Sequence, residues 1–112
     1  MNLARVLANR GEIPEARFQF EQAVRLKPDL AEARLDYGHL LADRGELDAA
    51  IKQLETAVRL QSDLWRAHFE LAMALGRRGN TVAAREQLTI AANGADADVR
   101  RDALEVLHQL GN

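Results

Sequence analysis

The feature that most constrains the fold of this chain is a repeat with a period of 34 residues. Shifting the sequence against itself by that period aligns three segments without gaps: LARVLANRGEIPEA (3–16), YGHLLADRGELDAA (37–50) and LAMALGRRGNTVAA (71–84). The columns that recur hold apolar residues, small residues or glycine, whereas the polar columns vary. A repeat of this length is typical of a solenoid, in which each unit buries its apolar face against its neighbours.

Each unit predicts two helices joined by a glycine turn. In the second unit we expect the first helix at about 31–43 and the second at about 48–60, with Asp48 as its N-cap. Gly45 lies in the turn, where a glycine accepts positive φ at no steric cost. Small Gly38 permits the two helices to approach closely. The second helix carries an amphipathic stripe of Ala50, Ile51, Leu54, Ala57 and Val58.

Residues 97–110, ADVRRDALEVLHQL, predict a seventh helix. Its apolar face consists of Val99, Ala103, Val106, Leu107 and Leu110. The helix is displaced by one residue from the repeat, because Leu75 and Leu110 are 35 residues apart. We expect it to cap the array by covering the last apolar face. The predicted fold is all-α and a single domain over 1–112, with units at about 1–30, 31–64 and 65–96 and a capping helix at about 97–110.

Composition excludes several functional classes. The chain has no cysteine, so disulfides and thiolate chemistry are absent. Its 15 basic and 17 acidic residues leave a net charge of −2, which argues against binding to nucleic acid or to an anionic membrane. No apolar stretch reaches the roughly 18 residues of a membrane span, and the N-terminus is too polar for a secretory signal. The compartment stays open.

The repeat resembles the tetratricopeptide repeat, whose pattern is W-x2-L-G-x2-Y…A-x3-F…P over 34 residues. The second unit matches it most closely and keeps Gly38, Gly45, Ala50 and Ala57. It departs from the pattern at four positions, which are held by Arg34, Leu41, Leu54 and Ser62. The first unit keeps Phe20 and Pro28, and in the third unit Gly94 is expected to end the second helix early. The resemblance covers about residues 1–94 and implies a right-handed superhelix of antiparallel helix pairs that binds a protein or peptide partner.

The resemblance also implies that the first helix of each unit lines a concave groove. The exposed positions of those helices are the candidate partner-binding residues: Arg5, Asn9, Glu32, Leu35, Asp36, His39, Asp43, Arg66, Phe69, Glu70, Met73 and Arg77. Phe69 and Met73, four residues apart, form with Leu35 an apolar grip for a peptide side chain. The alternative is that Phe69 packs against a neighbouring helix.

Members of the family that bind chaperone tails hold a peptide's terminal carboxylate with basic and amide side chains. The corresponding positions here are Met1, Arg5, Asp36, Arg66 and Glu70. Asp36 and Glu70 would repel a carboxylate, so this ligand is disfavoured. A segment that carries basic and apolar residues fits the groove better.

Catalysis is not expected. His39 and Asp43 share a helix face at the i, i+4 spacing of a possible ligand pair. However, two ligands do not make a metal site, and the other units hold Arg5 and Asn9, or Met73 and Arg77, in these columns. We therefore predict no enzyme activity, no metal and no cofactor.

The favoured hypothesis is a scaffold for protein–protein interaction through the groove. The runner-up is an oligomerisation or spacer segment that acts through its N-terminal edge, where Met1 corresponds to the fifth position of a first helix. Phe69→Glu is expected to harm only the first function, and Leu3→Glu mainly the second.

Overall fold

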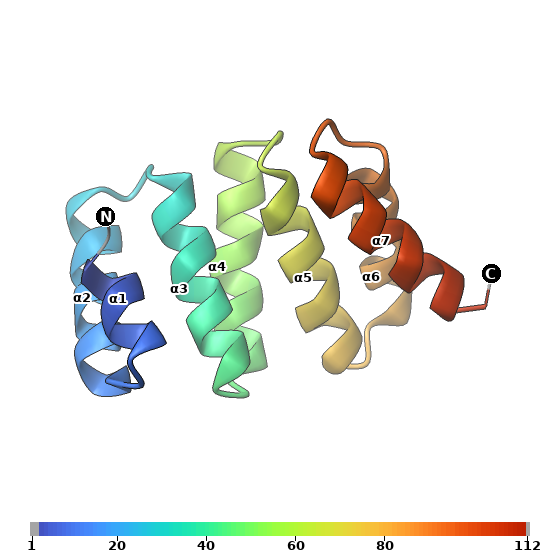
Figure 1. Cartoon of the computed structure of the whole chain (residues 1–112). Coiled ribbons are helices and arrows are strands. Elements are labelled where there is room, and N and C mark those ends of the chain that lie inside the picture. Colours follow the sequence, from blue (N-terminus) through green and yellow to red (C-terminus); the bar gives the residue numbers. More distant parts are fainter. Residues whose placement is uncertain (1–2, 112) are drawn as a thin grey trace.

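The computed structural model describes residues 3–111, which form seven α-helices and no strand (Figure 1). The helices are α1 (Leu3–Asn9), α2 (Ile13–Leu26), α3 (Ala31–Asp43), α4 (Leu47–Leu60), α5 (Trp65–Arg77), α6 (Thr81–Ala92) and α7 (Ala97–Gln109). Figure 1 shows α1, α3, α5 and α7 in one layer, with α2, α4 and α6 behind them. The array measures 41 × 25 × 21 Å. The predicted all-α array of helix pairs is confirmed over the described residues.

The same turn ends the first helix of every unit. At the end of α3, Glu46 N–H donates to Leu41 O at 2.9 Å and Gly45 N–H donates to Ala42 O at 3.0 Å. This pair of bonds is the Schellman arrangement, which requires a left-handed residue after the helix. Gly45 supplies it with φ of 78°, and the equivalent glycines Gly11 and Gly79 have φ of 81° and 95°. The recurring glycine column is therefore explained by backbone geometry.

The turn also sets where the second helix begins, and here the prediction for Asp48 was wrong. α4 starts at Leu47, so its N-cap is Glu46, the residue that closes the Schellman turn. Asp48 lies inside the first turn of α4, where its carboxylate accepts a 2.8 Å hydrogen bond from Arg78 Nε. The spacing between turn and helix is so short that the end of one helix motif is the beginning of the next.

The two helices of the second unit approach each other through Gly38. A Cβ built on Gly38 would lie 2.7 Å from Leu54 Cγ and 3.4 Å from Ala50 O. Leu54 and Ala50 are fully buried. The absence of a side chain on α3 thus allows a leucine of α4 to lie directly against the backbone, which confirms the close approach expected from the sequence.

Aromatic packing joins the first unit to the second. The rings of Phe20 on α2 and Tyr37 on α3 stack with centroids 5.8 Å apart and planes inclined by 15°. The Tyr37 hydroxyl donates to Glu21 Oε2 at 3.1 Å, which satisfies its polar end near the surface. Stacked rings at this separation add to the stabilisation from apolar burial.

The seventh helix caps the array as predicted. Asp96 accepts hydrogen bonds from the N–H groups of Asp98 and Val99, which fixes the start of α7. Val99 and Ala103 are fully buried against the third unit, in a cluster that includes Leu88. Toward its C-terminal end the predicted apolar face leaves the core, and Leu110 is 41% exposed.

The third unit is shortened at Gly94, as predicted, but for a steric reason. A Cβ on Gly94 would lie 2.5 Å from Cδ2 of the Trp65 indole. Its φ is not in the left-handed region, so backbone conformation does not demand a glycine here. The residue is small because the tryptophan of α5 packs on the backbone that follows α6.

We expect Gly38→Ala to lower the free energy of unfolding by about 1–2 kcal/mol in urea titrations at 25 °C. Overpacking a close contact costs about 1–3 kcal/mol. Alanine recovers about 1 kcal/mol of helix propensity, so the packing cost dominates.

Gly76→Ala on α5 is the matched control. The nearest atom to its added Cβ is Ala84 Cβ at 3.8 Å, an ordinary contact. This change should raise the free energy of unfolding by about 0.5–1 kcal/mol, because only the propensity gain remains. A Gly38→Ala protein as stable as Gly76→Ala would show that the α3–α4 contact is not tight.

Candidate functional site

A hollow of about 350 Å³, here called the central hollow, lies against the first helices of the three units. Its lining comes from α1, α2, α3 and α5 and consists of Arg5, Ala8, Asn9, Phe20, Leu35, Asp36, His39, Leu40, Asp43, Arg66 and Glu70. The three residues Asp36, His39 and Asp43 reach it from a single face of α3, because they are spaced by three and four positions. Neighbouring first helices place Arg5 on one side of that face and Glu70 on the other.

The hollow brings together eight of the twelve residues predicted from the sequence, namely Arg5, Asn9, Leu35, Asp36, His39, Asp43, Arg66 and Glu70. Their assembly follows from the repeat, since equivalent positions on successive first helices lie side by side in a stacked array. Whether these residues bind a partner stays a prediction.

Ion pairs connect the four helices of this layer. Arg5 Nε on α1 lies 3.9 Å from Asp36 Oδ2 on α3. His39 on α3 lies 3.0 Å from Glu70 Oε1 on α5. Arg66 on α5 lies 4.0 Å from Asp102 Oδ2 on α7. Pairs of such exposure contribute little stability individually, about 0–1 kcal/mol, so their main effect is to set the charge of the surface.

His39 is held between two carboxylates. Its Nδ1 lies 3.0 Å from Glu70 Oε1, and its Nε2 lies 3.3 Å from Asp43 Oδ2. Two acceptors require two N–H donors, and only the protonated imidazole has both. The hydrogen bond with Glu70 accordingly raises the pKa of His39, more than partial burial lowers it. The predicted His39–Asp43 pair is thus part of an ion-pair cluster that spans two units.

Asp36 sits deeper in the hollow than its neighbours. Loss of hydration raises the pKa of its carboxyl, while the guanidinium of Arg5 opposes that shift. Burial of a carboxylate with one distant cation leaves it incompletely neutralised. Asp36 is therefore a point at which an added cation would be favourable.

The expected apolar grip of Phe69 and Met73 is not formed. Phe69 is half-buried and packs against the cluster of Ala72, Leu88, Val99 and Ala103, so the alternative interpretation of this residue is the one observed. The guanidinium carbon of Arg66 lies 5.5 Å from the centre of the Phe69 ring. The sequence placed Phe69 on the outer face because helical spacing cannot show that α7 covers that part of α5.

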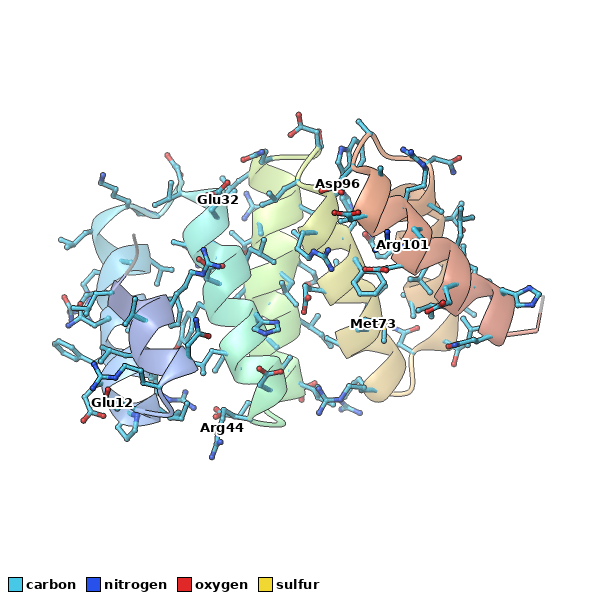
Figure 2. All side chains as sticks on the ribbon, in the orientation of Figure 1. Glu12, Glu32, Arg44, Met73, Asp96 and Arg101 are labelled. Carbon is cyan, nitrogen blue, oxygen red and sulfur yellow. The ribbon has the colours of Figure 1, made fainter. Side chains whose placement is uncertain are left out.

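Three further predicted residues lie away from the central hollow. Met73 and Arg77 line a separate hollow between α5, α6 and α7. Glu32 is exposed in the first turn of α3 and lines neither hollow, and Figure 2 shows it at that end of the helix. The groove expected as one continuous strip is thus divided by the ridge of α5.

The wall residues that the prediction left out are Ala8, Phe20 and Leu40. Ala8 and Leu40 lie on first helices but are uncharged, and Phe20 belongs to a second helix. Phe20 is one of the positions that match the repeat pattern, so its column was a usable signal. Met1, one of the positions in the chaperone-tail comparison, lies outside the described residues.

Two features of the described chain bear on chemistry at this site. No group of three or more His, Asp or Glu side chains among residues 3–111 is arranged to hold a metal ion. His68, which is buried, contacts Ser62 O at 2.9 Å and Gln87 Oε1 at 2.7 Å, as expected for a histidine packed between helices. In the same part of the chain, no helix combines the length and the apolar character needed to cross a membrane.

Solved structures show the same fold. The type III secretion translocator chaperone SycD of Yersinia enterocolitica aligns with a TM-score of 0.86 and 20% identity, over 96% of this chain and 76% of that one. MamA aligns with a TM-score of 0.81 and 23% identity, over 99% and 66% of the two chains. YrrB, described as a TPR protein with an unusual peptide-binding site, aligns at 0.79 and 25% identity, over 98% and 54%.

Sequence comparison points to the same family. A search of the curated proteins finds no match. A family model described as Tetratricopeptide repeat matches residues 1–64 and 35–99, which together cover most of the chain. The predicted resemblance and the predicted α-solenoid are both confirmed. The chain belongs to the tetratricopeptide repeat family.

Proposed function

We propose that this chain is a protein-interaction scaffold whose central hollow holds a segment of a partner protein, and that the segment carries a basic side chain. The observation that carries the proposal is the set of three carboxylates, Asp36, Asp43 and Glu70, around one hollow. No catalytic activity is part of the proposal, and the hollow acts only by binding.

The two arginines of the hollow do not cancel this acidic character. Arg66 is directed toward α7, where it lies 4.0 Å from Asp102 and over the Phe69 ring. Arg5 reaches Asp36 only at 3.9 Å, from a side chain that is 63% exposed. Opposite charges placed across an interface guide the choice of partner and the rate of encounter more than they raise affinity.

Two of the similar structures support a peptide as the ligand. SycD is described in complex with a peptide of the translocator YopD, and YrrB is described as having a peptide-binding site. Repeat arrays of stacked helices commonly bind partners along an extended surface. A segment with one basic residue between apolar residues suits a hollow in which Leu35 and Leu40 lie beside the carboxylates.

A second candidate is self-association through α1 and α2. Three large apolar side chains there are unusually exposed: Leu3 at 56%, Phe18 at 56% and Leu26 at 76%. Contiguous exposed apolar surface often marks an interaction site.

For the central hollow, we expect Asp36→Lys with Glu70→Lys to abolish capture of partners that bear basic segments, in pull-downs from the source lysate read by mass spectrometry. The matched control is Glu55→Lys with Glu86→Lys, which makes the same charge change at exposed positions of α4 and α6. Partners that persist in both variants would place binding elsewhere. Phe69→Glu is unsuitable for this test, since Phe69 packs in the core.

Binding to the central hollow should depend on the protonation of His39. The raised pKa of His39 means that the imidazolium neutralises Glu70 and Asp43 at low pH and releases them as the pH rises through that pKa. We expect the capped peptide Ala-Leu-Lys-Leu-Ala to bind about fivefold more tightly at about pH 9 than at about pH 6, from one charge at contact distance in water. Calorimetric titration measures this ratio.

The control for the pH experiment is His39→Gln, which keeps hydrogen-bonding capacity and removes the charge. Its affinity should be independent of pH over the same range. The same linkage acts on folding: the contribution of His39 to stability is complete below about pH 6.5 and is lost as the pH rises through the raised pKa. An equal pH step in His39→Gln would assign the effect to another group.

For self-association, we expect sedimentation velocity to show a concentration-dependent dimer that Leu3→Glu with Leu26→Glu removes. Introducing charge on an apolar contact surface opposes its burial. Leu104→Glu on α7, a residue that is 53% exposed, is the control at the opposite end of the array. A monomer at every concentration would contradict this second candidate.

A further inference from the structure

A second hollow, here called the C-terminal hollow, lies between α5 and α7 with α6 as its floor. Its volume is about 280 Å³, and it shares no lining residue with the central hollow. Figure 1 shows α7 moving away from α5 toward its C-terminal end, where the two helices leave space between them. Residues buried at the start of α7, such as Val99, close the other end of this wedge.

The walls of the C-terminal hollow are apolar. Met73 on α5 and Leu110 beyond α7 are 38% and 41% exposed, while Leu88 in the floor is buried. Gly76 and Ala84 leave room because they have small or no side chains. Met73, which Figure 2 shows on the α5 side, has a flexible and polarisable side chain that adapts to different apolar partners.

One charged residue lines this hollow, and it is Arg77. Its Nη1 donates to Ala42 O at 2.9 Å, which anchors the guanidinium against the end of α3. Within residues 3–111 the side chain makes no ion pair with a carboxylate. A guanidinium has five N–H donors, so most of them remain available to a ligand.

We propose that the C-terminal hollow is a second docking site, which takes an apolar side chain of a partner peptide while Arg77 binds a carboxylate beside that side chain. Charge complementarity selects this occupant: the hollow presents apolar walls and one anchored cation without a counter-ion. Guanidinium and carboxylate form paired hydrogen bonds that fix orientation as well as adding affinity. The proposal goes beyond the basic segment assigned to the central hollow, because it concerns different residues and the opposite ligand charge.

The geometry relates the two sites along α5. Glu70 and Arg77 are seven residues apart on one helix, a rise of about 10 Å. An extended peptide covers that distance in about three residues. One partner segment can therefore place a basic residue in the central hollow and an apolar–acidic pair in the C-terminal hollow, although the second site does not need the first to be filled.

The test uses the full chain and capped peptides that lack basic residues, so that it is separate from the test of the central hollow. The peptide Gly-Ser-Phe-Asp-Ser-Gly is titrated into ¹⁵N-labelled protein and followed by amide chemical shifts. We expect shifts at Gly76, Arg77 and Leu110 and none at His39 or Asp36. Peptides with Asn in place of Asp, or Ala in place of Phe, should bind at least about tenfold more weakly, as expected for loss of a charged hydrogen bond or of a buried ring.

The matched variants are Arg77→Gln and Arg78→Gln. Both remove one positive charge, but Arg78 is paired with Asp48 and does not line the hollow. Arg77→Gln should weaken the Phe-Asp peptide about tenfold or more, whereas Arg78→Gln should leave its affinity unchanged. Thermal unfolding of both variants checks that the fold is intact, and Arg77→Lys, which keeps the charge, should retain part of the affinity.

Several outcomes would overturn the proposal. Equal weakening by the two glutamine variants would reduce the effect to general electrostatics. Equal binding of the Asp and Asn peptides would remove the role of Arg77, and shifts confined to the central hollow would move the ligand there. A dimer that dissociates in Arg77→Gln would identify a second copy of the chain as the occupant instead.

Discussion

The array depends on a steric pairing between a small residue on each first helix and a large one on the second. In the second unit this is Gly38 against Leu54, with no room for a Cβ. The same columns hold Ala72 and Leu88 in the third unit, and both lie in one core cluster. Because the two helices are locked at close range, the outer face of each first helix has a defined direction, and the positions of the groove residues follow from it.

The consequence for the surface is a layer of first helices joined by charges and divided by shape. His39 connects α3 to α5 through Glu70, and Arg66 connects α5 to α7 through Asp102. Between these links lie two separate hollows, one lined by carboxylates and one by apolar side chains with a single cation. A scaffold with two such sites selects a partner by the order of charges along its segment, which neither site could do alone.

The histidine between two carboxylates illustrates how a repeat carries variable function. Its column holds Arg5 and Met73 in the other units, so the fold places no demand on it. The imidazole acquires its raised pKa from Glu70, a residue of the next unit. Chemistry at this surface thus arises between units, where columns that vary independently come into contact, and the structural columns beneath them stay the same.

The sequence by itself determined the helices, their turns and the layer on which the candidate residues lie. The period of 34 residues and the glycine column were enough, because Schellman turns and amphipathic stripes are local. Eight of the twelve candidate residues were placed in one hollow on that basis. Only the tertiary structure decided the fates of Phe69, Met73 and Arg77, since these depend on the angle at which α7 crosses α5. That angle is set by packing of Val99 and Ala103 on the third unit, a long-range contact that no spacing along the chain encodes.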